Sequence, residues 1–313
     1  MSLYLVSGGL GFIGSNIVHR LLDDGKEVRV IDNLATGRKS NIASVIEEFE
    51  LLEGDIRDYS AVERSMESVD YVLHQAALPS VARSIINPYE SNEVNVLGTL
   101  NLLKAAHEAD IKQFVYASSS SVYGDTPTLP KVENMPVNPK SFYSVSKYAA
   151  EQQCIIYNQI NGLNTVCLRY FNVYGPRQDP SSQYAAVIPK FITSIAKDES
   201  PTVFGDGTQS RDFTFIEDAV LANLKAAKSS KGVGEVCNIA VGQRRTVNEL
   251  IGLVNELLEK NIDAEYAKPR PGDVKHSHAD ISKAQRLLGY KPEHDLKKGL
   301  EKTVEWFRDS KFQ

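Results

Sequence analysis

A glycine-rich turn near the start of the chain places the strongest constraint on the fold. An apolar run, Leu3–Ser7, leads into the turn at residues 8–14, and an amphipathic stretch over 13–22 follows. Glycines at positions 8, 11 and 14 allow a tight turn, a close approach of the backbone to an anion, and close packing of helix on strand. The free N–H groups at the start of such a helix suit a pyrophosphate. The turn therefore predicts a strand–turn–helix unit that binds a dinucleotide.

Short apolar strands alternate with helical stretches through the first half of the chain, which is typical of repeated βαβ units around a parallel sheet. Further strands are predicted at 27–31, 49–53, 70–74, 113–117 and 165–168, and further helices at 91–109 and 142–159. From residue 169 onward, Gly and Pro turns loosen this pattern before the later helices at 247–259, Ser282–Leu288 and 296–307. We expect an α/β fold, a Rossmann-type doubly wound parallel sheet with a smaller interleaved C-terminal substrate-binding lobe.

The boundary between these two parts carries no Ser/Gly linker. We therefore expect residues 1–168 to form the dinucleotide-binding domain, together with returning segments near 213–240. Residues 169–313 are expected to form mainly the substrate-binding lobe.

Composition excludes several classes of protein. The 313 residues are 42% hydrophobic and 24% charged, as in ordinary globular proteins. Lys and Arg total 35 against 40 Asp and Glu, a net charge of -5, and no dense basic run is present, which argues against a nucleic-acid partner. No apolar window is long enough for a membrane span, and the N-terminus lacks a leader pattern. We expect a cytoplasmic protein without membrane contact.

Cysteines and histidines give no metal-binding pattern. Cys154, Cys167 and Cys237 lie far apart among apolar neighbours, which predicts reduced thiols in the core. His276 and His278 have no third ligand at a suitable spacing. We expect no metal, and we place these two histidines at a pocket rim or on the surface.

A carboxylate follows the second predicted strand. Asp32 lies where a side chain can accept both ribose hydroxyls of a dinucleotide and repel a 2′-phosphate. This position favours NAD over NADP. The alternative is that Asp32 and Asn33 form an ordinary turn at the end of a strand.

A tyrosine, a lysine and a run of serines form the candidate catalytic group. Tyr143 and Lys147 are four residues apart in a helical pattern, so both project from one face. Such a pair also arises by chance on solvated helices, but the serines at 118–121 end the fifth predicted strand, at the edge where parallel sheets bind ligands. A phenol needs its pKa lowered by about three units to act as a base near neutral pH. We expect the lysine ammonium and an oxidised nicotinamide to provide that shift.

Taken together, these residues resemble the extended short-chain dehydrogenase/reductase family and its nucleotide-sugar epimerases. The resemblance covers nearly the whole chain. Beyond the features above, it is carried by 54–58 (Gly-Asp-Ile-Arg-Asp), 74–77 (His-Gln-Ala-Ala), 95–99 (Asn-Val-Leu-Gly-Thr), 118–124 and 169–175 (Arg-Tyr-Phe-Asn-Val-Tyr-Gly). It implies NAD as cofactor, a UDP-sugar as substrate, and a homodimer formed through the helices at 91–109 and 142–159.

The resemblance also implies roles for individual residues. The catalytic group is Ser119, Tyr143 and Lys147. The cofactor would contact Gly8, Gly11, Phe12, Ile13, Gly14, Asp32, Asn33, Thr36, Gly37, Asp55, Ile56, Gln75, Ala76, Ala77, Leu78, Asn95, Tyr143, Lys147 and Phe171, the last facing the nicotinamide. The substrate would contact Ser119, Ser120, Ser121, Tyr143, Asn172, Val187, Ile188, Val203, Phe204, Arg211, Arg270, Asp273 and Ser277.

The reaction subclass follows from residues that are missing. Sugar dehydratases and decarboxylases of the family carry acidic residues where this chain has Ser120 and Ser121. A purely redox cycle remains, in which hydride leaves C4 and returns to the other face of a transient 4-keto sugar. The resemblance therefore implies an isomerase, a UDP-sugar 4-epimerase that regenerates NAD in each turnover.

The choice of sugar rests on position 277, where relatives restricted to plain hexoses carry a tyrosine. Ser277 leaves space for an acetamido group, which favours UDP-GlcNAc/UDP-GalNAc together with UDP-glucose/UDP-galactose. The run of four serines also resembles the UDP-glucuronate 4-epimerases, so a carboxylated sugar is the alternative. A non-catalytic NAD-binding regulator on the same fold is an alternative of another class.

Overall fold

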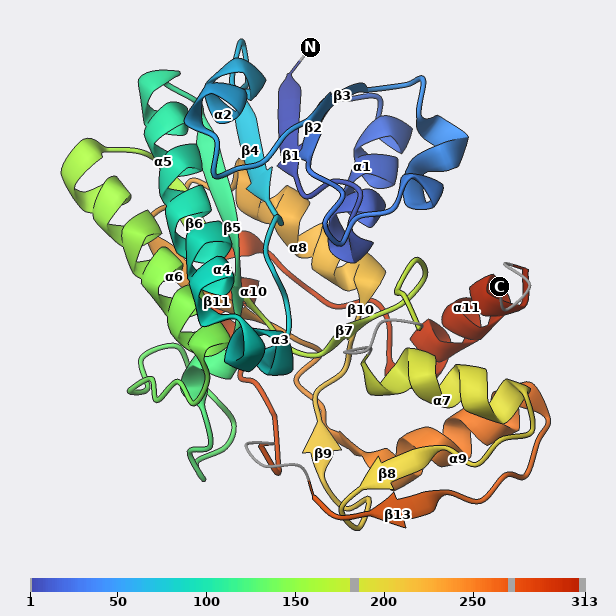
Figure 1. The fold of residues 1–313 in the computed structure, drawn as a ribbon. Coiled ribbons are helices and arrows are strands. Elements are labelled where there is room, and N and C mark those ends of the chain that lie inside the picture. Colours follow the sequence, from blue (N-terminus) through green and yellow to red (C-terminus); the bar gives the residue numbers. More distant parts are fainter. Residues whose placement is uncertain (1, 181–185, 270–273, 310–313) are drawn as a thin grey trace.

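The computed structural model describes residues 2–180, 186–269 and 274–309. A seven-stranded parallel sheet, ordered β11-β6-β5-β4-β1-β2-β3, forms the larger lobe (Figure 1). The strands are β1 (Leu3–Ser7), β2 (Glu27–Asp32), β3 (Glu50–Glu53), β4 (Tyr71–His74), β5 (Gln113–Ser119), β6 (Thr165–Tyr170) and β11 (Glu235–Ile239). Because all seven run in the same direction, their carboxyl ends meet at one edge of the sheet.

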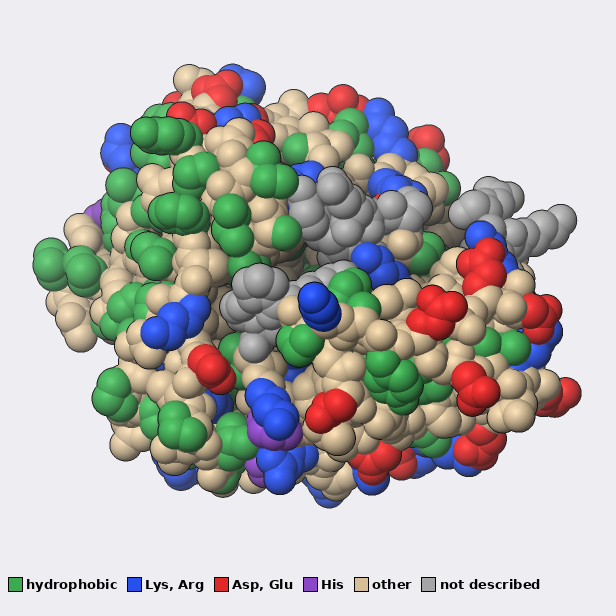
Figure 2. All heavy atoms as spheres, turned by 60° about the horizontal axis from the view of Figure 1, so that its bottom comes forward, with side chains coloured by type: hydrophobic (Ala, Val, Ile, Leu, Met, Phe, Trp, Pro, Cys, Tyr) green, Lys and Arg blue, Asp and Glu red, His purple; other side chains and the backbone are tan. Residues whose placement is uncertain are grey.

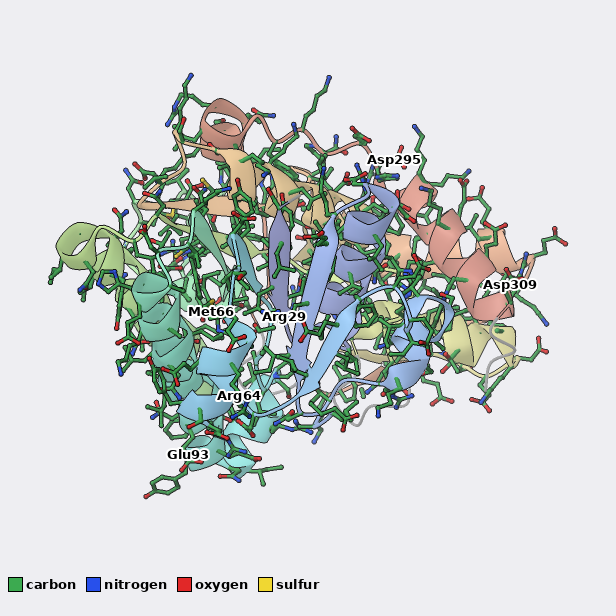
Figure 3. All side chains as sticks on the ribbon, turned by 90° about the horizontal axis from the view of Figure 1, so that it is seen from above. Arg29, Arg64, Met66, Glu93, Asp295 and Asp309 are labelled. Carbon is green, nitrogen blue, oxygen red and sulfur yellow. The ribbon has the colours of Figure 1, made fainter. Side chains whose placement is uncertain are left out.

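Helices cover both faces of this sheet, as Figure 3 shows from above. One face carries α1 (Phe12–Asp23) and α8 (Ile216–Lys228), and the other carries α2 (Tyr59–Ser65), α5 (Thr99–Glu108) and α6 (Phe142–Asn161). Alternation along β1 explains the two layers, because Tyr4 and Val6 pack into one hydrophobic cluster and Leu5 into the other. The predicted doubly wound α/β fold is confirmed.

The predicted helix at 91–109 consists of three joined elements. These are α4 (Pro88–Asn92), the π-helical segment η2 (Glu93–Gly98) and α5. Asn87 caps the first of them, since its side chain accepts the N–H of Glu90 and Pro88 starts the helix. Apolar spacing alone cannot distinguish a π segment from α-helix, so the sequence predicted one continuous helix.

The smaller lobe lies below the sheet in the view of Figure 1. It contains the three later helices that the sequence predicted, together with the helix Val187–Ala196 and short strands that it did not predict. Its helices are α7 (Val187–Ala196), α9 (Val247–Leu258) and α11 (Leu296–Asp309), and α10 (Ser282–Leu288) packs near β11. Short strands pair as β8 (Thr202–Phe204) with β13 (Glu265–Ala267), β9 (Ser210–Arg211) with β12 (Arg245–Thr246), and β7 (Val173–Tyr174) with β10 (Thr214–Phe215). The remaining short helices are η1 (Lys39–Val45), α3 (Val81–Ile86) and η3 (Ser120–Tyr123).

Chain segments far apart in sequence build the larger lobe. After the chain enters the smaller lobe it returns to the sheet, where α8 packs on β5 and β6 and β11 pairs with β6 as an edge strand. Among the described residues, no helix is both long and apolar enough to cross a membrane.

Candidate active site

The glycine turn forms one wall of a pocket at the carboxyl edge of the sheet. Gly8 has φ +70°, and a Cβ there would lie 2.7 Å from the Cα of Ala76. A Cβ on Gly14 would lie 2.1 Å from the carbonyl oxygen of Gly8. The first glycine thus lets the turn approach the loop after β4, and the second lets α1 pack against the turn.

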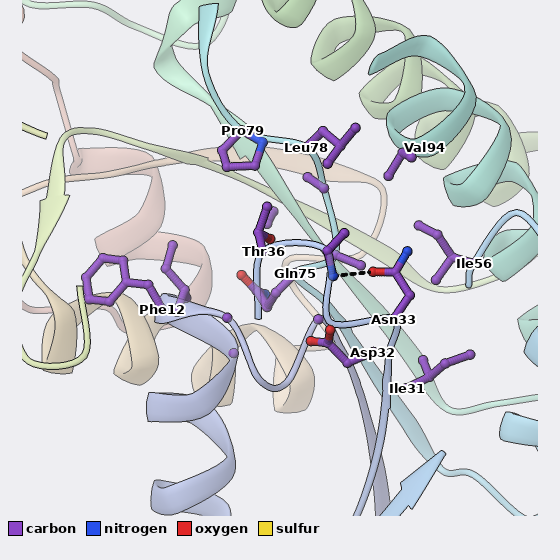
Figure 4. A pocket seen from close by; sticks show the side chains of 18 of the residues that line it. Phe12, Ile31, Asp32, Asn33, Thr36, Ile56, Gln75, Leu78, Pro79 and Val94 are labelled. Carbon is purple, nitrogen blue, oxygen red and sulfur yellow. Dashed lines mark hydrogen bonds between the residues drawn. The ribbon is translucent and has the colours of Figure 1, made fainter. Parts of the chain in front are cut away.

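Asp32 lies at the end of β2 beside this turn, and Figure 4 shows its carboxylate at the pocket. It accepts the N–H groups of Leu10 at 3.0 Å and Leu34 at 2.8 Å, and burial raises its pKa. A Cβ at Gly37 would lie 2.9 Å from both carboxylate oxygens. Two carboxylate oxygens offer about four acceptor sites, so two remain for hydroxyl donors. This donor and acceptor set fits the ribose and pyrophosphate of NAD.

Most residues expected to contact the cofactor line one pocket. These are Gly8, Gly11, Phe12, Ile13, Gly14, Asp32, Asn33, Thr36, Ile56, Gln75, Ala76, Ala77, Leu78, Tyr143 and Lys147. Ile56, Leu78 and Val94 give it an apolar side, as Figure 4 shows. The pocket therefore extends from the glycine turn to the candidate catalytic helix.

Four expected cofactor residues lie outside the lining of this pocket. Gly37 touches the carboxylate of Asp32, and Asp55 holds the side chains of Asn33 and Arg57 at the rim. Asn95 is buried in η2, where it accepts the N–H of Leu78 at 2.8 Å and donates to the Ser146 hydroxyl at 3.0 Å. Phe171 is buried beside the ring of Tyr123. Gly37, Asp55 and Asn95 thus lie against residues that line the pocket, whereas Phe171 packs beside Tyr123, which does not line it.

Helix α6 carries the candidate tyrosine and lysine. Its N-terminus is set by a capping box between Ser141 and Ser144, so the helix begins just before Tyr143. The Ser119 hydroxyl, at the end of β5, lies close enough to the phenol of Tyr143 to lower its pKa. Lys147 is buried one turn further along, with its Nζ 4.9 Å from the centre of the Tyr116 ring. The structure thus brings together the three residues predicted to be catalytic.

The electrostatics of this group differ from expectation in one respect. Burial raises the pKa of Tyr143, and the nearby Ser119 hydroxyl only partly opposes this shift. Burial also lowers the pKa of Lys147 to about 8. In the protein's own groups burial therefore outweighs any downward shift of the phenol pKa, and the shift expected from the lysine together with an oxidised nicotinamide stays a prediction. Desolvation disfavours the charged form of both side chains, and it is the largest effect on each.

The four serines at 118–121 have distinct surroundings. Ser118 donates to the buried Glu151 at 2.6 Å, and the oxygen of Ser119 accepts the N–H of Ser121 at 3.2 Å. The buried Oγ of Ser121 is one of three side-chain atoms in the described part of the chain that are buried without a hydrogen-bond partner. Leaving such a hydroxyl unpaired costs about 1–3 kcal/mol, so this group is suited to a ligand.

A second hollow lies in the smaller lobe between α7, β8, β9 and β13. Of the residues expected to contact substrate, Val187, Val203, Phe204 and Arg211 line it. Ile188 is buried in the hydrophobic cluster that includes Phe191. Arg211 donates to the carbonyl oxygens of Ser210 and Lys275, both at 3.0 Å. Arg270 and Asp273 lie outside the described residues.

Asn172 and Ser277 meet at the start of this lobe. The Nδ2 of Asn172 donates to the Ser277 hydroxyl at 3.4 Å and to the carbonyl of Asp212 at 3.1 Å. The Asp212 carboxylate is buried and accepts the N–H groups of Val241 at 3.0 Å and Ala279 at 3.2 Å. This buried carboxylate therefore anchors the segment that carries Ser277.

Sequence reasoning missed several residues that line the cofactor pocket. They are Ile31, Ala35, Gly54, Arg57, Pro79, Glu90, Val94, Ala117, Ser118 and Tyr170. Tyr170 could have been found from its place at the end of β6, within the motif at 169–175 already singled out. The hydroxyl of Tyr170 accepts a hydrogen bond from the Nδ2 of Asn223 at 2.7 Å. The Oδ1 of Asn223 in turn accepts a hydrogen bond from the Nε2 of Gln75 at 2.9 Å. That link to α8 joins residues far apart in sequence, so no local pattern indicates it.

The two histidines near the smaller lobe have ordinary partners. His276 Nδ1 lies 2.9 Å from the Ser210 hydroxyl, and His278 Nε2 lies 3.1 Å from the carbonyl oxygen of Gly242. In residues 2–180, 186–269 and 274–309, no group of three His, Cys, Asp or Glu side chains could hold a metal ion.

Comparison with known proteins places this architecture in a family. A UDP-glucose 4-epimerase of Mycolicibacterium smegmatis is 37% identical over 309 residues, covering 97% of this chain and 98% of that protein. The structure of a UDP-N-acetylglucosamine 4-epimerase from Methanobrevibacter ruminantium M1, in complex with UDP-N-acetylmuramic acid, has a TM-score of 0.95 and 41% identity over 99% of both chains.

The structure of a UDP-glucuronic acid 4-epimerase from Bacillus cereus, in complex with UDP-glucuronic acid and NAD, has a TM-score of 0.90 and 32% identity, covering 98% of this chain and 99% of that one. The model of the NAD dependent epimerase/dehydratase family matches residues 4–240. That range contains the glycine turn, the serines of β5 and helix α6, so the chain belongs to the NAD-dependent epimerase/dehydratase family.

Proposed function

We propose that this protein is a UDP-sugar 4-epimerase that keeps NAD as its redox cofactor. The observation that carries the proposal is the pocket that begins at the glycine turn and ends at Tyr143 and Lys147 on α6, with the Ser119 hydroxyl close enough to Tyr143 to act on its pKa. Relatives named as UDP-sugar 4-epimerases align with nearly all of the chain. We therefore assign Ser119, Tyr143 and Lys147 as the catalytic residues.

Each of these residues has a defined task. Bound NAD supplies the acceptor and donor of the hydride at C4 of the sugar. Tyr143 holds or releases the proton of the C4 oxygen, and Ser119 orients that oxygen by a hydrogen bond. The Lys147 ammonium favours the phenolate, since an opposite charge within about 4–6 Å stabilises the charged form. Gly8, Asp32 and the rest of the pocket lining would hold NAD.

The nucleotide part of the substrate is assigned to the hollow in the smaller lobe. Arg211 brings a guanidinium to its wall, and Val203 and Phe204 supply apolar contacts. A planar guanidinium is suited to a diphosphate. In this assignment the sugar contacts Ser120, Ser121 and Asn172. The other expected contacts with the nucleotide part of the substrate are Val187, Ile188, Arg270 and Asp273.

We favour UDP-GlcNAc/UDP-GalNAc as the substrate pair, together with UDP-glucose/UDP-galactose. Ser277 lies beside Asn172, and its small side chain occupies less space than a tyrosine would, which favours a substrate with an acetamido group. UDP-glucuronate is the second candidate, supported by the unpartnered hydroxyl of Ser121 within the run of serines. That hydroxyl can donate to a carboxylate.

The proposed enzyme is a homodimer. An apolar face spans α3, α4, η2 and α6, and Figure 2 shows hydrophobic side chains gathered on that side of the molecule. Its exposed members are Val81, Ile85, Ile86, Tyr89, Leu97, Phe142, Val145, Ile156 and Ile160. A contiguous apolar face of this size is typical of a protein interface, and a second copy of the chain is the partner that the family resemblance implies.

The experiment incubates the purified protein with UDP-GlcNAc, UDP-galactose or UDP-glucuronate, with no added reductant, and reads the C4 configuration by proton NMR. Conversion to an equilibrium mixture is expected, fastest for the acetamido sugar. The Tyr143→Phe variant is expected to lose turnover while still binding the cofactor, measured by fluorescence titration with NADH. If the wild type with bound NAD converts none of the three sugars, the proposed function is wrong.

A further inference from the structure

A buried ion pair lies directly behind the candidate catalytic residues, and no step of the proposed chemistry uses it. The guanidinium of Arg169 in β6 holds the carboxylate of Glu151 in α6 by two hydrogen bonds, from Nη2 at 2.6 Å and from Nε at 2.9 Å. The side chains are 4% and 0% exposed. We propose that this pair is a positioning device that fixes Ser119, Tyr143 and Lys147 relative to one another.

The first reason is the direct link to the strand that carries Ser119. The hydroxyl of Ser118 donates to the Glu151 carboxylate at 2.6 Å, and Ser118 is the residue before Ser119. Alternate residues of a strand point to opposite faces, so anchoring Ser118 also directs the side chain of Ser119. A rotation of this strand end would break a charge-assisted hydrogen bond inside the protein.

The second reason is the spacing along α6. Tyr143, Lys147 and Glu151 are separated by four residues each, so they lie along one face of the helix. An anchor at Glu151 resists both rotation and sliding of the helix, because a guanidinium fork holds a carboxylate in one plane. The α6 backbone then carries this constraint to Lys147 and Tyr143.

The third reason is that the pair extends into a network that reaches the smaller lobe. The Arg169 guanidinium lies 4.7 Å from the centre of the Tyr123 ring in η3, and the Tyr123 hydroxyl donates to Asn238 in β11 at 2.7 Å. Asn238 in turn donates to the carbonyl oxygen of Asp280 at 3.2 Å. The pair thus connects the serine turn with the segment that follows Ser277.

Stability alone does not account for such a pair. Replacing a buried ion pair by apolar side chains of similar size is often neutral or stabilising, because both charges must be removed from water. Catalysis, in contrast, is sensitive to position, and a displacement of about 1 Å can lower a rate by about 100-fold. The inference rests on the proposed function, since its main readout is epimerisation.

The test compares a double variant, which carries both Glu151→Leu and Arg169→Met, with the wild-type holoenzyme. We expect kcat to fall by about 10- to 100-fold with little change in KM. The affinity for NADH, measured by fluorescence titration, is expected to change by less than about threefold. A primary isotope effect with a C4-deuterated UDP-sugar is expected to increase, because misalignment slows the hydride step itself. Glu151→Gln, which keeps the shape and one acceptor, should recover part of the rate.

Two controls separate positioning from a general loss of stability. Leu300→Ala removes a buried side chain from α11 in the smaller lobe, and it is expected to lower the melting temperature while leaving kcat unchanged. Glu256→Gln breaks the exposed ion pair with Lys297, and it should change neither the melting temperature nor kcat.

The outcomes are distinct. If the folded double variant keeps the wild-type kcat and isotope effect, the positioning role is wrong. If Leu300→Ala lowers kcat as much as the double variant at equal loss of stability, the effect is structural and the proposal is also wrong. If the wild type converts no UDP-sugar, the proposed function fails first.

Discussion

The side-chain amide of Asn172 and the hydroxyl of Ser277 lie 3.4 Å apart, although the residues come from opposite ends of the smaller lobe's sequence. Ser277 is therefore a small polar side chain at the proposed sugar site, and the amide of Asn172 donates a hydrogen bond to it. The Ser277→Tyr change is expected to lower kcat/KM for UDP-GlcNAc by about 10-fold or more, because a larger side chain overfills the space. UDP-galactose should lose less.

Ser277→Ala is the matched control for this variant, since it removes the hydrogen bond to Asn172 without adding volume. Competition assays with both sugars measure the ratio of kcat/KM. An equal loss for both sugars in the tyrosine variant would show that size does not select the acetamido group.

Ser119→Ala is expected to slow turnover by about 10²- to 10³-fold, because it removes an oriented hydrogen-bond donor from the transition state beside Tyr143. KM should change little. Steady-state kinetics measure both, with Ser282→Ala, an exposed position on α10, as control. An unchanged turnover rate would show that Ser119 is not a catalytic residue.

The pKa of Lys147, lowered by burial to about 8, predicts the alkaline limb of the pH profile. The ammonium is the form that favours the phenolate, so kcat should fall by about tenfold per pH unit above that value. Lys147→Arg retains a charge that does not titrate in this range and should move the limb to higher pH. A wild-type profile that stays flat to strongly alkaline pH would contradict the role of Lys147.

Asp212 predicts a pH dependence of stability. Burial raises the pKa of this carboxyl from 3.8 to about 6. Between these values the folded state holds a proton that the unfolded state has lost, so stability falls as pH rises. The wild type should lose about 2–3 kcal/mol of unfolding free energy between about pH 4 and pH 7, relative to Asp212→Asn.

Urea unfolding of both proteins at the two pH values measures this difference. Because the asparagine amide cannot accept the N–H groups of both Val241 and Ala279, we also expect the variant to be the less stable protein at about pH 4. A constant difference across pH would contradict the assignment to Asp212.

The apolar face on α6 and η2 predicts an effect on assembly. Replacing Leu97 and Ile156, which are 45% and 48% exposed, by glutamate places unpaired charges in the proposed interface. The dimer dissociation constant should rise by about 100-fold or more, as measured by analytical ultracentrifugation. Gln285→Glu adds a charge at an exposed position on α10 and should leave assembly unchanged. A wild type that sediments as a monomer would contradict the dimer.

The sequence by itself determined the parallel sheet, the glycine turn and the helix that carries Tyr143 and Lys147, because each depends on local patterns. Glycine spacing, strand alternation and the four-residue interval between Tyr143 and Lys147 are properties of neighbouring residues. Motifs adjacent to those patterns also indicated most of the cofactor pocket.

Only the tertiary structure decided which residues meet across long separations. The pairing of Glu151 with Arg169, the link from Tyr170 through Asn223 to Gln75, and the contact of Asn172 with Ser277 each join elements brought together by folding. The direction of the Tyr143 pKa shift could likewise not be predicted from the sequence, because desolvation depends on how tightly the whole chain packs around the phenol. Local patterns specify strands, helices and turns, whereas burial and long-range contacts arise when those elements pack together.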